Sequence, residues 1–325
     1  MLDIVWIVIG FILLVKGADY LVDGASHIAK RFHIPEIIIG LTIVAVGTSM
    51  PELVVSVTSA LEGHSDISVG NIIGSNIANM FLILGICSIM KPLEFKKQSR
   101  LIENPLTLGL TILLFVLCNN GNSENAHLIT KNEGILLLGL CVLYIIYNII
   151  MAKKGERFDL EEGQELPQED TSSTKILKAI FNIIIGIIGL KLGGDLVVNA
   201  CVAIASSFGI SEELISLTIV AVSTSLPELI TSITATRKGE TDMAIGNILG
   251  SQIFNILLII GTSAFLCPIN YAVSYNKYML VLIMGTMMLS LFPFVGTKNK
   301  MTRSNGIPFV LIYALYMVSL VMFNG

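Results

Sequence analysis

The chain has 325 residues, of which 54% are hydrophobic and 14% are charged, and its formal net charge is −4. These values exclude an ordinary soluble domain, because the apolar runs are longer than the helices that soluble proteins bury. We expect an integral membrane protein that is surrounded by the lipid bilayer and has no nucleic-acid partner. A monomer is compatible with that expectation.

The apolar runs predict ten membrane-spanning helices when about 20 residues are allowed for each crossing. The spans are expected at residues 3–29, 36–61, 67–90, 101–118, 134–151, 175–206, 213–236, 242–266, 277–295 and 305–323. The expected fold is therefore an all-α integral membrane protein with ten transmembrane helices.

An internal repeat divides these spans into five and five. LTIVAVGTSMPEL at 41–53 returns as LTIVAVSTSLPEL at 217–229, and about 25 residues are identical between 40–85 and 216–261. Because each half, 1–151 and 175–325, has an odd number of crossings, the two repeats must enter the membrane from opposite sides. Such inverted five-helix repeats suit a transporter that opens alternately to the two sides.

The segment 152–174 is the one long polar connection, and it contains KKGERFDLEEGQELPQEDTSST. Its acidic composition, with proline and glycine, predicts a flexible linker between the halves. The alternative is a regulatory loop that binds cations.

The expected loops on one side of the membrane carry sixteen Lys and Arg residues, whereas those on the other side carry only Lys131 and Lys277. By the positive-inside rule, we expect the basic side and the linker to be cytoplasmic, and both termini to lie on the extracytoplasmic side of the cytoplasmic membrane. The start MLD lacks a basic stretch, so we expect no cleavable signal peptide.

Glu52 and Glu228 each fall near the middle of a predicted span. An acidic side chain there costs about 2.5–3.5 kcal/mol on insertion scales. Because the four spans that carry the repeat motifs contain no basic residue, a bound cation is the simplest compensation for the two carboxylates.

A proline precedes each glutamate, at Pro51 and Pro227, and should bend or break its helix. Such a break at mid-membrane is tolerated where the backbone lines a cavity or binds an ion. The carbonyl groups expected to become free lie around Ala45, Thr48, Ala221 and Thr224, and hydroxyl oxygens are added by Thr48, Ser49, Thr224 and Ser225.

The third and eighth spans supply the matching motifs GNIIGSNIANMFLILG at 70–85 and GNILGSQIFNILLIIG at 246–261. A spacing of four residues places Ser75 with Asn79, and Ser251 with Asn255, on one helix face. Four glycines with the same spacing should allow close helix packing: Gly70, Gly74, Gly246 and Gly250. The alternative is a packing motif with polar side chains and no ion.

Every candidate ligand is an oxygen atom from a carboxylate, hydroxyl, amide or backbone group. Such sites suit hard ions such as Ca²⁺ and Na⁺, whereas Zn²⁺ and copper favour His or Cys, which these motifs lack. We expect no resident cofactor, with Ca²⁺ and Na⁺ as the transported substrates.

GTSMPEL with GNIIGSNIAN, and STSLPEL with GNILGSQIFN, resemble the two signature repeats of the calcium/cation antiporter superfamily, in particular its prokaryotic sodium/calcium exchangers. The resemblance implies ten helices in inverted repeats and exchange of Ca²⁺ for Na⁺. It also implies that Glu52 and Glu228 bind Ca²⁺ with the carbonyls of Thr48 and Thr224. Sodium sites would include Ser49, Ser75, Ser225, Ser251 and the carbonyls of Ala45 and Ala221, while Asn79 and Asn255 would face the middle position.

Three residues depart from the superfamily pattern. Ser223 replaces a glycine and should stiffen the second break. Gln252 replaces an asparagine and is expected to lie outside the ligands of the ion. Asn255 stands where several relatives have aspartate, which argues against potassium co-transport.

Two carboxylates balance one Ca²⁺, and several Na⁺ ions competing for the same ligands would yield exchange. We expect the spans 3–29 and 175–206 to slide against a core made of the spans 36–61, 67–90, 213–236 and 242–266. Lys16 with Asp19 and Asp23, and Lys191 with Asp195, have the spacing of ion pairs within a helix.

A proton/calcium antiporter that uses the same glutamates is the main alternative. A membrane enzyme is disfavoured because HExxH and GxSxG motifs are missing from the sequence. A cation channel is disfavoured because two buried carboxylates would hold a divalent ion too tightly for fast conduction.

Overall fold

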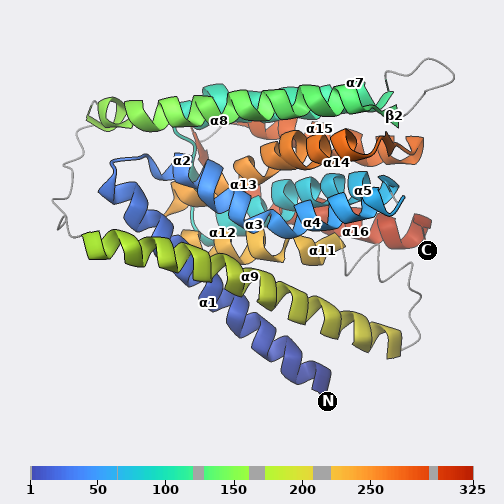
Figure 1. Cartoon of the computed structure of the whole chain (residues 1–325), viewed down its shortest axis with the longest axis horizontal. Coiled ribbons are helices and arrows are strands. Elements are labelled where there is room, and N and C mark those ends of the chain that lie inside the picture. Colours follow the sequence, from blue (N-terminus) through green and yellow to red (C-terminus); the bar gives the residue numbers. More distant parts are fainter. Residues whose placement is uncertain are drawn as a thin grey trace.

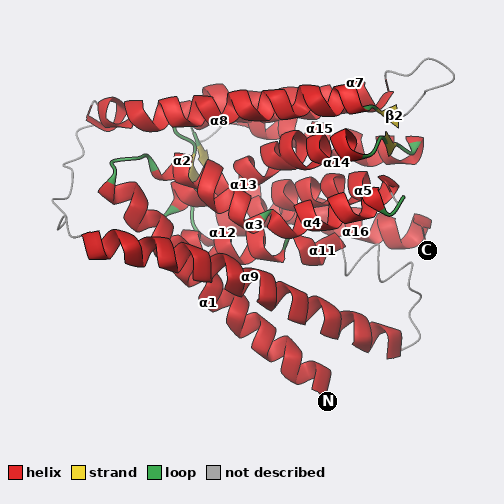
Figure 2. Ribbon diagram, viewed as in Figure 1, coloured by secondary structure: helices red, strands yellow, loops and turns green. Residues whose placement is uncertain are grey.

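The structure is a computed structural model that describes residues 2–63, 65–119, 128–160, 173–207, 221–292 and 299–324. Nearly all of these residues are helical (Figure 2). The predicted linker falls partly outside this range, as do residues 213–220 of the seventh expected span.

The first half contains a long N-terminal helix, two helical segments with interruptions, and two further long helices. Their bounds are α1 Leu2–Arg31, α2 Glu36–Ile39, η1 Gly40–Val44, α3 Ala45–Thr48, α4 Met50–Leu61, α5 Ser65–Ile77, η2 Ala78–Ile83, α6 Leu84–Met90, η3 Ser99–Glu103, α7 Asn104–Asn119 and α8 Lys131–Leu160. Helix α8 continues nine residues past the expected end at 151, so the start of the predicted linker is helical.

The second half follows the same order in the described residues. Its elements are α9 Ser173–Ser207, α11 Ala221–Thr224, α12 Leu226–Lys238, α13 Thr241–Phe254, η5 Asn255–Ile260, α14 Gly261–Leu266, η6 Val273–Tyr275, α15 Asn276–Leu291 and α16 Arg303–Asn324. Two short antiparallel strand pairs join the halves, β1 (Leu93–Glu94) with β4 (Lys300–Met301) and β2 (Leu128–Ile129) with β3 (Ile269–Asn270).

Six helical segments of the described chain are long and apolar enough to cross a membrane, and the bent segment from Glu36 to Leu61 would be a seventh. Large apolar side chains remain exposed on the outer helices, for example Leu143 (62%), Leu177 (70%) and Leu315 (70%). Exposing these apolar side chains to water would be unfavourable, whereas contact with lipid tails is not. The protein is therefore a multi-pass membrane protein.

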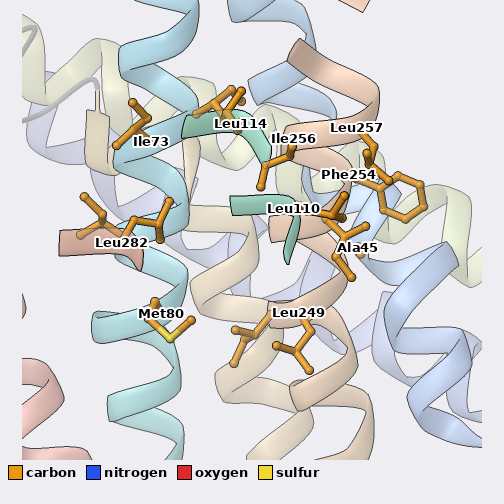
Figure 3. Close-up of a cluster of buried hydrophobic side chains, with 14 of the residues drawn as sticks. Ala45, Ile73, Met80, Leu110, Leu114, Leu249, Phe254, Ile256, Leu257 and Leu282 are labelled. Atoms are coloured by element: carbon orange, nitrogen blue, oxygen red, sulfur yellow. The ribbon is translucent and has the colours of Figure 1, made fainter. Parts of the chain in front are cut away.

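Helices α1 and α9 lie along one side of the molecule and α7 and α8 along the opposite side, with α4, α5 and α13 between them (Figure 1). The interior is a continuous apolar cluster to which both halves contribute (Figure 3). Leu110 and Leu114 of α7 pack there with Leu249 of α13 and Met80 of η2. This cluster surrounds the polar groups described below and separates them from lipid.

Glycines bring α1 and α9 into backbone contact along their length. A Cβ atom added at Gly17 would lie 2.8 Å from the carbonyl oxygen of Gly186, and one at Gly193 would lie 2.7 Å from that of Gly10. Since real Cβ atoms do not approach other atoms so closely, only glycine fits at these crossing points. The two helices expected to move together are thus packed as one pair.

The aspartates of α1 pair with another helix rather than with Lys16. Lys238, at the end of α12, lies 3.2 Å from Asp19 and 2.8 Å from Asp23. The expected pairing with Lys16 within the helix is wrong, because the end of α12 packs against α1 and brings a second lysine within reach. The expected pair of Lys191 with Asp195 is confirmed at 2.7 Å.

A second ion pair also fastens α1 to the core near this end. Glu240, in the turn between α12 and α13, accepts hydrogen bonds from Ser26 at 2.9 Å and Lys30 at 3.1 Å. Partial burial favours a raised pKa, but hydrogen bonds from Glu36, Ser26 and Lys30 outweigh it and hold the pKa of Glu240 below its usual value.

Candidate functional site

Each proline-containing helix is broken at a serine, and the glutamate lies in the first turn of the helix that follows the break. Ser49 has φ −84° and ψ 9°, and Ser225 has φ −85° and ψ 3°, in the sparsely populated region between helix and strand. The axis bends by 48° between Glu36–Thr48 and Met50–Leu61. The predicted breaks are confirmed. Pro51 and Pro227 each deprive a preceding carbonyl of its N–H donor.

Glu52 and Glu228 lie in the first turns of α4 and α12 and are completely buried. One oxygen of each carboxylate, Oε2, has no hydrogen-bond partner among the described residues. No ion pair in the described part of the chain reaches either carboxylate. Two buried acidic groups therefore converge without a protein cation to balance them.

Serine hydroxyls from the breaks and from α5 hold the other oxygens of the carboxylates. Ser49 donates to Glu228 Oε1 at 2.9 Å, and Ser75 donates to Glu52 Oε1 at 3.3 Å. Ser225 donates to Ser75 Oγ at 3.1 Å. Since Ser49 belongs to the first repeat and Glu228 to the second, these contacts join the two repeats at one cluster.

A threonine, an asparagine and a serine form a chain of hydrogen bonds on each side of this cluster. Thr48 Oγ1 donates to Asn247 Oδ1 at 3.1 Å, and Asn247 Nδ2 donates to Ser232 Oγ at 2.9 Å. The repeat counterparts do the same: Thr224 donates to Asn71 at 3.1 Å, and Asn71 donates to Ser56 at 3.1 Å.

The sequence interpretation missed Asn71 and Asn247, together with Ser56 and Ser232. The signal was available, because both pairs recur at the same separation of 176 residues as the glutamates. Each asparagine accepts a hydrogen bond from the threonine hydroxyl of the opposite repeat. These hydrogen bonds fix the side chains of Thr48 and Thr224 at the break.

The carbonyl of Ala45 is not free, contrary to expectation. It accepts the backbone N–H of Ser49 at 3.0 Å and the hydroxyl of Thr48 at 3.3 Å. The helix closes one more turn before it breaks, which explains the difference. In the second repeat, Ala221 begins α11 at the edge of the described residues.

Asn79 and Asn255 are both completely buried, in the wide π-helical turns η2 and η5. Asn255 Nδ2 donates to Ser75 Oγ at 3.3 Å and to Asn76 Oδ1 at 2.9 Å. The side chain of Asn79 has no hydrogen-bond partner among the described residues, while the hydroxyl of Ser251 lies beside the Glu228 carboxylate. Such turns occur often at functional sites, and the sequence pattern did not reveal them.

The glycines of α13 pack against the backbone of the broken helix, as expected. A Cβ at Gly250 would lie 2.7 Å from the carbonyl oxygen of Leu41, and Gly246 meets Ile37 at least as closely. At Gly70 the neighbour is the ring of Tyr275 instead. No described atom lies near Gly74, and the residue that repeat symmetry would place there, Leu217, lies outside the described residues.

Comparison with known proteins relates most of the chain to one family. The sequence model of the family described as sodium/calcium exchanger protein matches residues 2–150 and 178–322. The chain belongs to the sodium/calcium exchanger family. It is 36% identical over 317 residues to the putative antiporter CaxA of Alkalimonas amylolytica, with 96% of each chain covered.

Two further members of the sodium/calcium exchanger family align along nearly their full length. The sodium/calcium exchanger MaX1 of Methanosarcina acetivorans is 30% identical, with 97% of both chains covered. The solved structure of the sodium-calcium exchanger NCX_Mj superposes with a TM-score of 0.82 at 30% identity, covering 98% of this chain and 99% of that one.

The donor set of this exchanger family member is built from oxygen throughout: carboxylates, hydroxyls, amide carbonyls and backbone carbonyls. Oxygen ligands with two negative charges match a divalent hard cation in charge, and the neutral oxygens can surround monovalent ions. Glu103 also has a buried Oε2 without a partner among the described residues, but Glu52 and Glu228 bring two such carboxylates to one cluster, where a cation can offset both charges.

Proposed function

We propose that the protein is a secondary active transporter that exchanges Ca²⁺ for Na⁺ across the cytoplasmic membrane. One observation carries the proposal: Glu52 and Glu228 are completely buried, and each keeps a carboxylate oxygen without a partner among the described residues. Burying such charges without compensation is strongly unfavourable, so a transported cation is the natural partner. The relatives named as antiporters and exchangers support the same function.

The proposed Ca²⁺ position lies between Glu52 and Glu228, with the backbone carbonyls of Thr48 and Thr224 as further ligands. The proposed Na⁺ positions use the same carboxylates with Ser49, Ser75, Ser225 and Ser251, and with the carbonyl of Ala221. Asn79 and Asn255 line the middle. Because the ions share ligands, Ca²⁺ and Na⁺ exclude each other, and this competition is the basis of exchange.

For the fold, we propose ten crossings in two inverted repeats, 1–151 and 175–325, joined by the cytoplasmic linker 152–174. The N- and C-terminal ends of the chain lie at the same end of the molecule, as an even number of crossings requires (Figure 1). Alternating access would arise when the glycine-packed pair α1 and α9 slides across the broken helices. Resting ion pairs from Lys238 to α1 would have to open during that motion.

Orientation is testable with cysteines introduced at exposed ends of helices. We expect a membrane-impermeant thiol reagent applied to intact cells to label a cysteine at Asn132 and to spare one at Lys97, since the lysine-rich end should be cytoplasmic. The native cysteines, five in number, are first replaced. The reverse labelling pattern would place both termini in the cytoplasm.

The coupling ion is testable with purified protein in liposomes. We expect an outward Na⁺ gradient alone to drive ⁴⁵Ca²⁺ uptake, because Ca²⁺ and Na⁺ compete for one oxygen cluster. Proton and K⁺ gradients, each imposed alone at zero Na⁺, serve as controls. Uptake that follows the pH gradient and ignores Na⁺ would replace this proposal with proton/calcium antiport on the same two glutamates.

The amide at position 255 provides a test of the central position. We expect wild-type exchange to be independent of K⁺, and Asn255→Asp to introduce K⁺ stimulation or a pH dependence. A third carboxylate beside Glu52 and Glu228 would favour an extra cation or a proton, since like charges at short range raise each other's proton affinity. The measurement is exchange rate against K⁺ and against pH. A variant indistinguishable from wild type would remove Asn255 from the site.

A further inference from the structure

Because of the internal repeat, the polar cluster has two groups of side chains that correspond to each other, here called its corners, and their hydrogen bonds can be compared. On the corner formed by α5 and η5, three side chains are joined by hydrogen bonds. Asn255 Nδ2 donates to Asn76 Oδ1 at 2.9 Å and to Ser75 Oγ at 3.3 Å. All three residues are essentially unexposed. The amide nitrogen of Asn255 is thus satisfied within this corner, while its Oδ1 is buried without a partner among the described residues.

The corner related by the repeat contains Asn79, Gln252 and Ser251, each 176 residues from its counterpart. Helix α13 packs against η2, as α5 packs against η5. All three side chains are fully buried. Neither amide has a hydrogen-bond partner among the described residues, at Asn79 Nδ2 and Oδ1 and at Gln252 Nε2 and Oε1, while the Ser251 hydroxyl lies beside the Glu228 carboxylate.

The two corners differ in one residue type, because the first has Asn76 where the second has Gln252. The glutamine is longer by one methylene group, so it does not reproduce the short bond that Asn76 makes with its asparagine. Unsatisfied buried amides are costly, and the membrane interior provides no bulk water to satisfy them. This corner leaves four buried amide atoms without a partner among the described residues, against one at the other corner, Asn255 Oδ1, so it has the greater need of a polar ligand.

The chemistry of the second corner, which contains Asn79, Gln252 and Ser251 and is here called the open corner, identifies the ligand. Its three oxygens are Asn79 Oδ1, Ser251 Oγ and Gln252 Oε1, which are all neutral. Neutral oxygens suit a hard monovalent cation, whereas the divalent ion is drawn to the carboxylates.

We propose that Gln252 is a Na⁺ ligand, and that its side-chain carbonyl oxygen, with the amide oxygen of Asn79 and the hydroxyl oxygen of Ser251, completes a Na⁺ position on one side of the cluster only. The proposal rests on the function proposed above. It replaces the expectation, drawn from the sequence, that Gln252 lies outside the ligands. It also makes the two repeats inequivalent in sodium binding although their glutamates are equivalent.

The test compares three variants in liposomes. Gln252→Met keeps the shape of the side chain and removes its oxygen. We expect it to raise the Na⁺ concentration for half-maximal Ca²⁺ release by about tenfold, as for one lost contact to a charged group. Ca²⁺/Ca²⁺ exchange measured without Na⁺ should stay within about twofold of wild type, because the carboxylates that bind Ca²⁺ are unchanged. Gln252→Glu keeps an oxygen of equal reach and should still respond to Na⁺, with a pH dependence added by the third carboxylate.

Asn148→Leu is the matched control, because Asn148 is a buried amide in α8 that donates to the Tyr144 carbonyl, away from the cluster. It should leave the Na⁺ response unchanged. Na⁺-dependent thermal stabilisation of each variant in detergent provides a second measurement that does not need transport. A parallel loss of Na⁺ and Ca²⁺ responses in Gln252→Met would indicate a structural role and overturn the proposal.

The two proposals fail in different ways. If wild-type protein responds to Na⁺ and Gln252→Met responds equally, only the role of Gln252 is overturned. If wild-type protein shows no Na⁺ response in either transport or thermal stabilisation, sodium coupling and the sodium position at Gln252 are both overturned.

Discussion

Replacing either glutamate by glutamine is expected to abolish Ca²⁺ transport and leave a folded protein. Glu52→Gln and Glu228→Gln each remove half of the negative charge that faces Ca²⁺, while the neutral amide is less costly to bury than the carboxylate. We expect ⁴⁵Ca²⁺ exchange below roughly a tenth of wild type, the scale of one lost charge contact. Thermal stability in the absence of ions should be equal to or above that of wild type.

Glu103→Gln is the matched control for this prediction. Glu103 is also a completely buried carboxylate in an apolar helix, but it lies in η3, where Gln98 and Tyr147 donate to its Oε1. The glutamine side chain can still accept those hydrogen bonds, so exchange should persist. If Glu103→Gln were as inactive as the two site variants, the loss would reflect buried acids in general and not the proposed Ca²⁺ position.

Adding one methyl group at the contact of α1 and α9 is expected to stop transport and lower stability. A Cβ at Gly193 would lie 2.7 Å from both the Gly10 carbonyl oxygen and the Leu14 nitrogen, which are backbone atoms that cannot turn aside. Gly193→Ala must therefore push the two helices apart, at a cost of about 1–3 kcal/mol for overpacking. Separated helices would no longer move as one pair.

The neighbouring glycine offers a control on the same turn of the same helix. No described atom lies within 4 Å of a Cβ added at Gly194. Gly194→Ala should therefore be neutral or stabilising, by about 0.5–1 kcal/mol from the helix preference of alanine. Melting temperature and exchange rate measured on both variants provide the comparison. Equal behaviour of the two would show that close contact at Gly193 has no role in function.

The parts of the site that depend on one helix were predictable from the sequence. Proline chemistry foretold the breaks at Ser49 and Ser225, because a missing N–H acts on its own helix. Spacing by four residues placed Ser75 and Asn79 on one face for the same local reason. The apolar runs placed the helices, although some ends differ from those expected, as at Leu160, where α8 ends nine residues later than expected.

Contacts between distant helices were not predictable in the same way. Thr224 and Asn71 are 153 residues apart, and Lys238 and Asp23 are 215 residues apart. Helical spacing states which residues share a face and leaves open which helix that face meets. The lysine of α12 therefore replaced Lys16 as the partner of the aspartates. That Gln252 has no hydrogen-bond partner among the described residues also depends on which distant helices pack around it, so the sequence did not predict it.

The crossed hydrogen bonds of the threonines have a consequence for the origin of the protein. Thr48 in the first repeat relies on Asn247 in the second, and Thr224 relies on Asn71 in the first. Neither half contains a complete set by itself. A half-length ancestor with this motif would have built the same contacts only by pairing with an identical chain of opposite orientation. Fusion of two such copies would make that pairing permanent and would allow the copies to diverge at single positions such as 76 and 252.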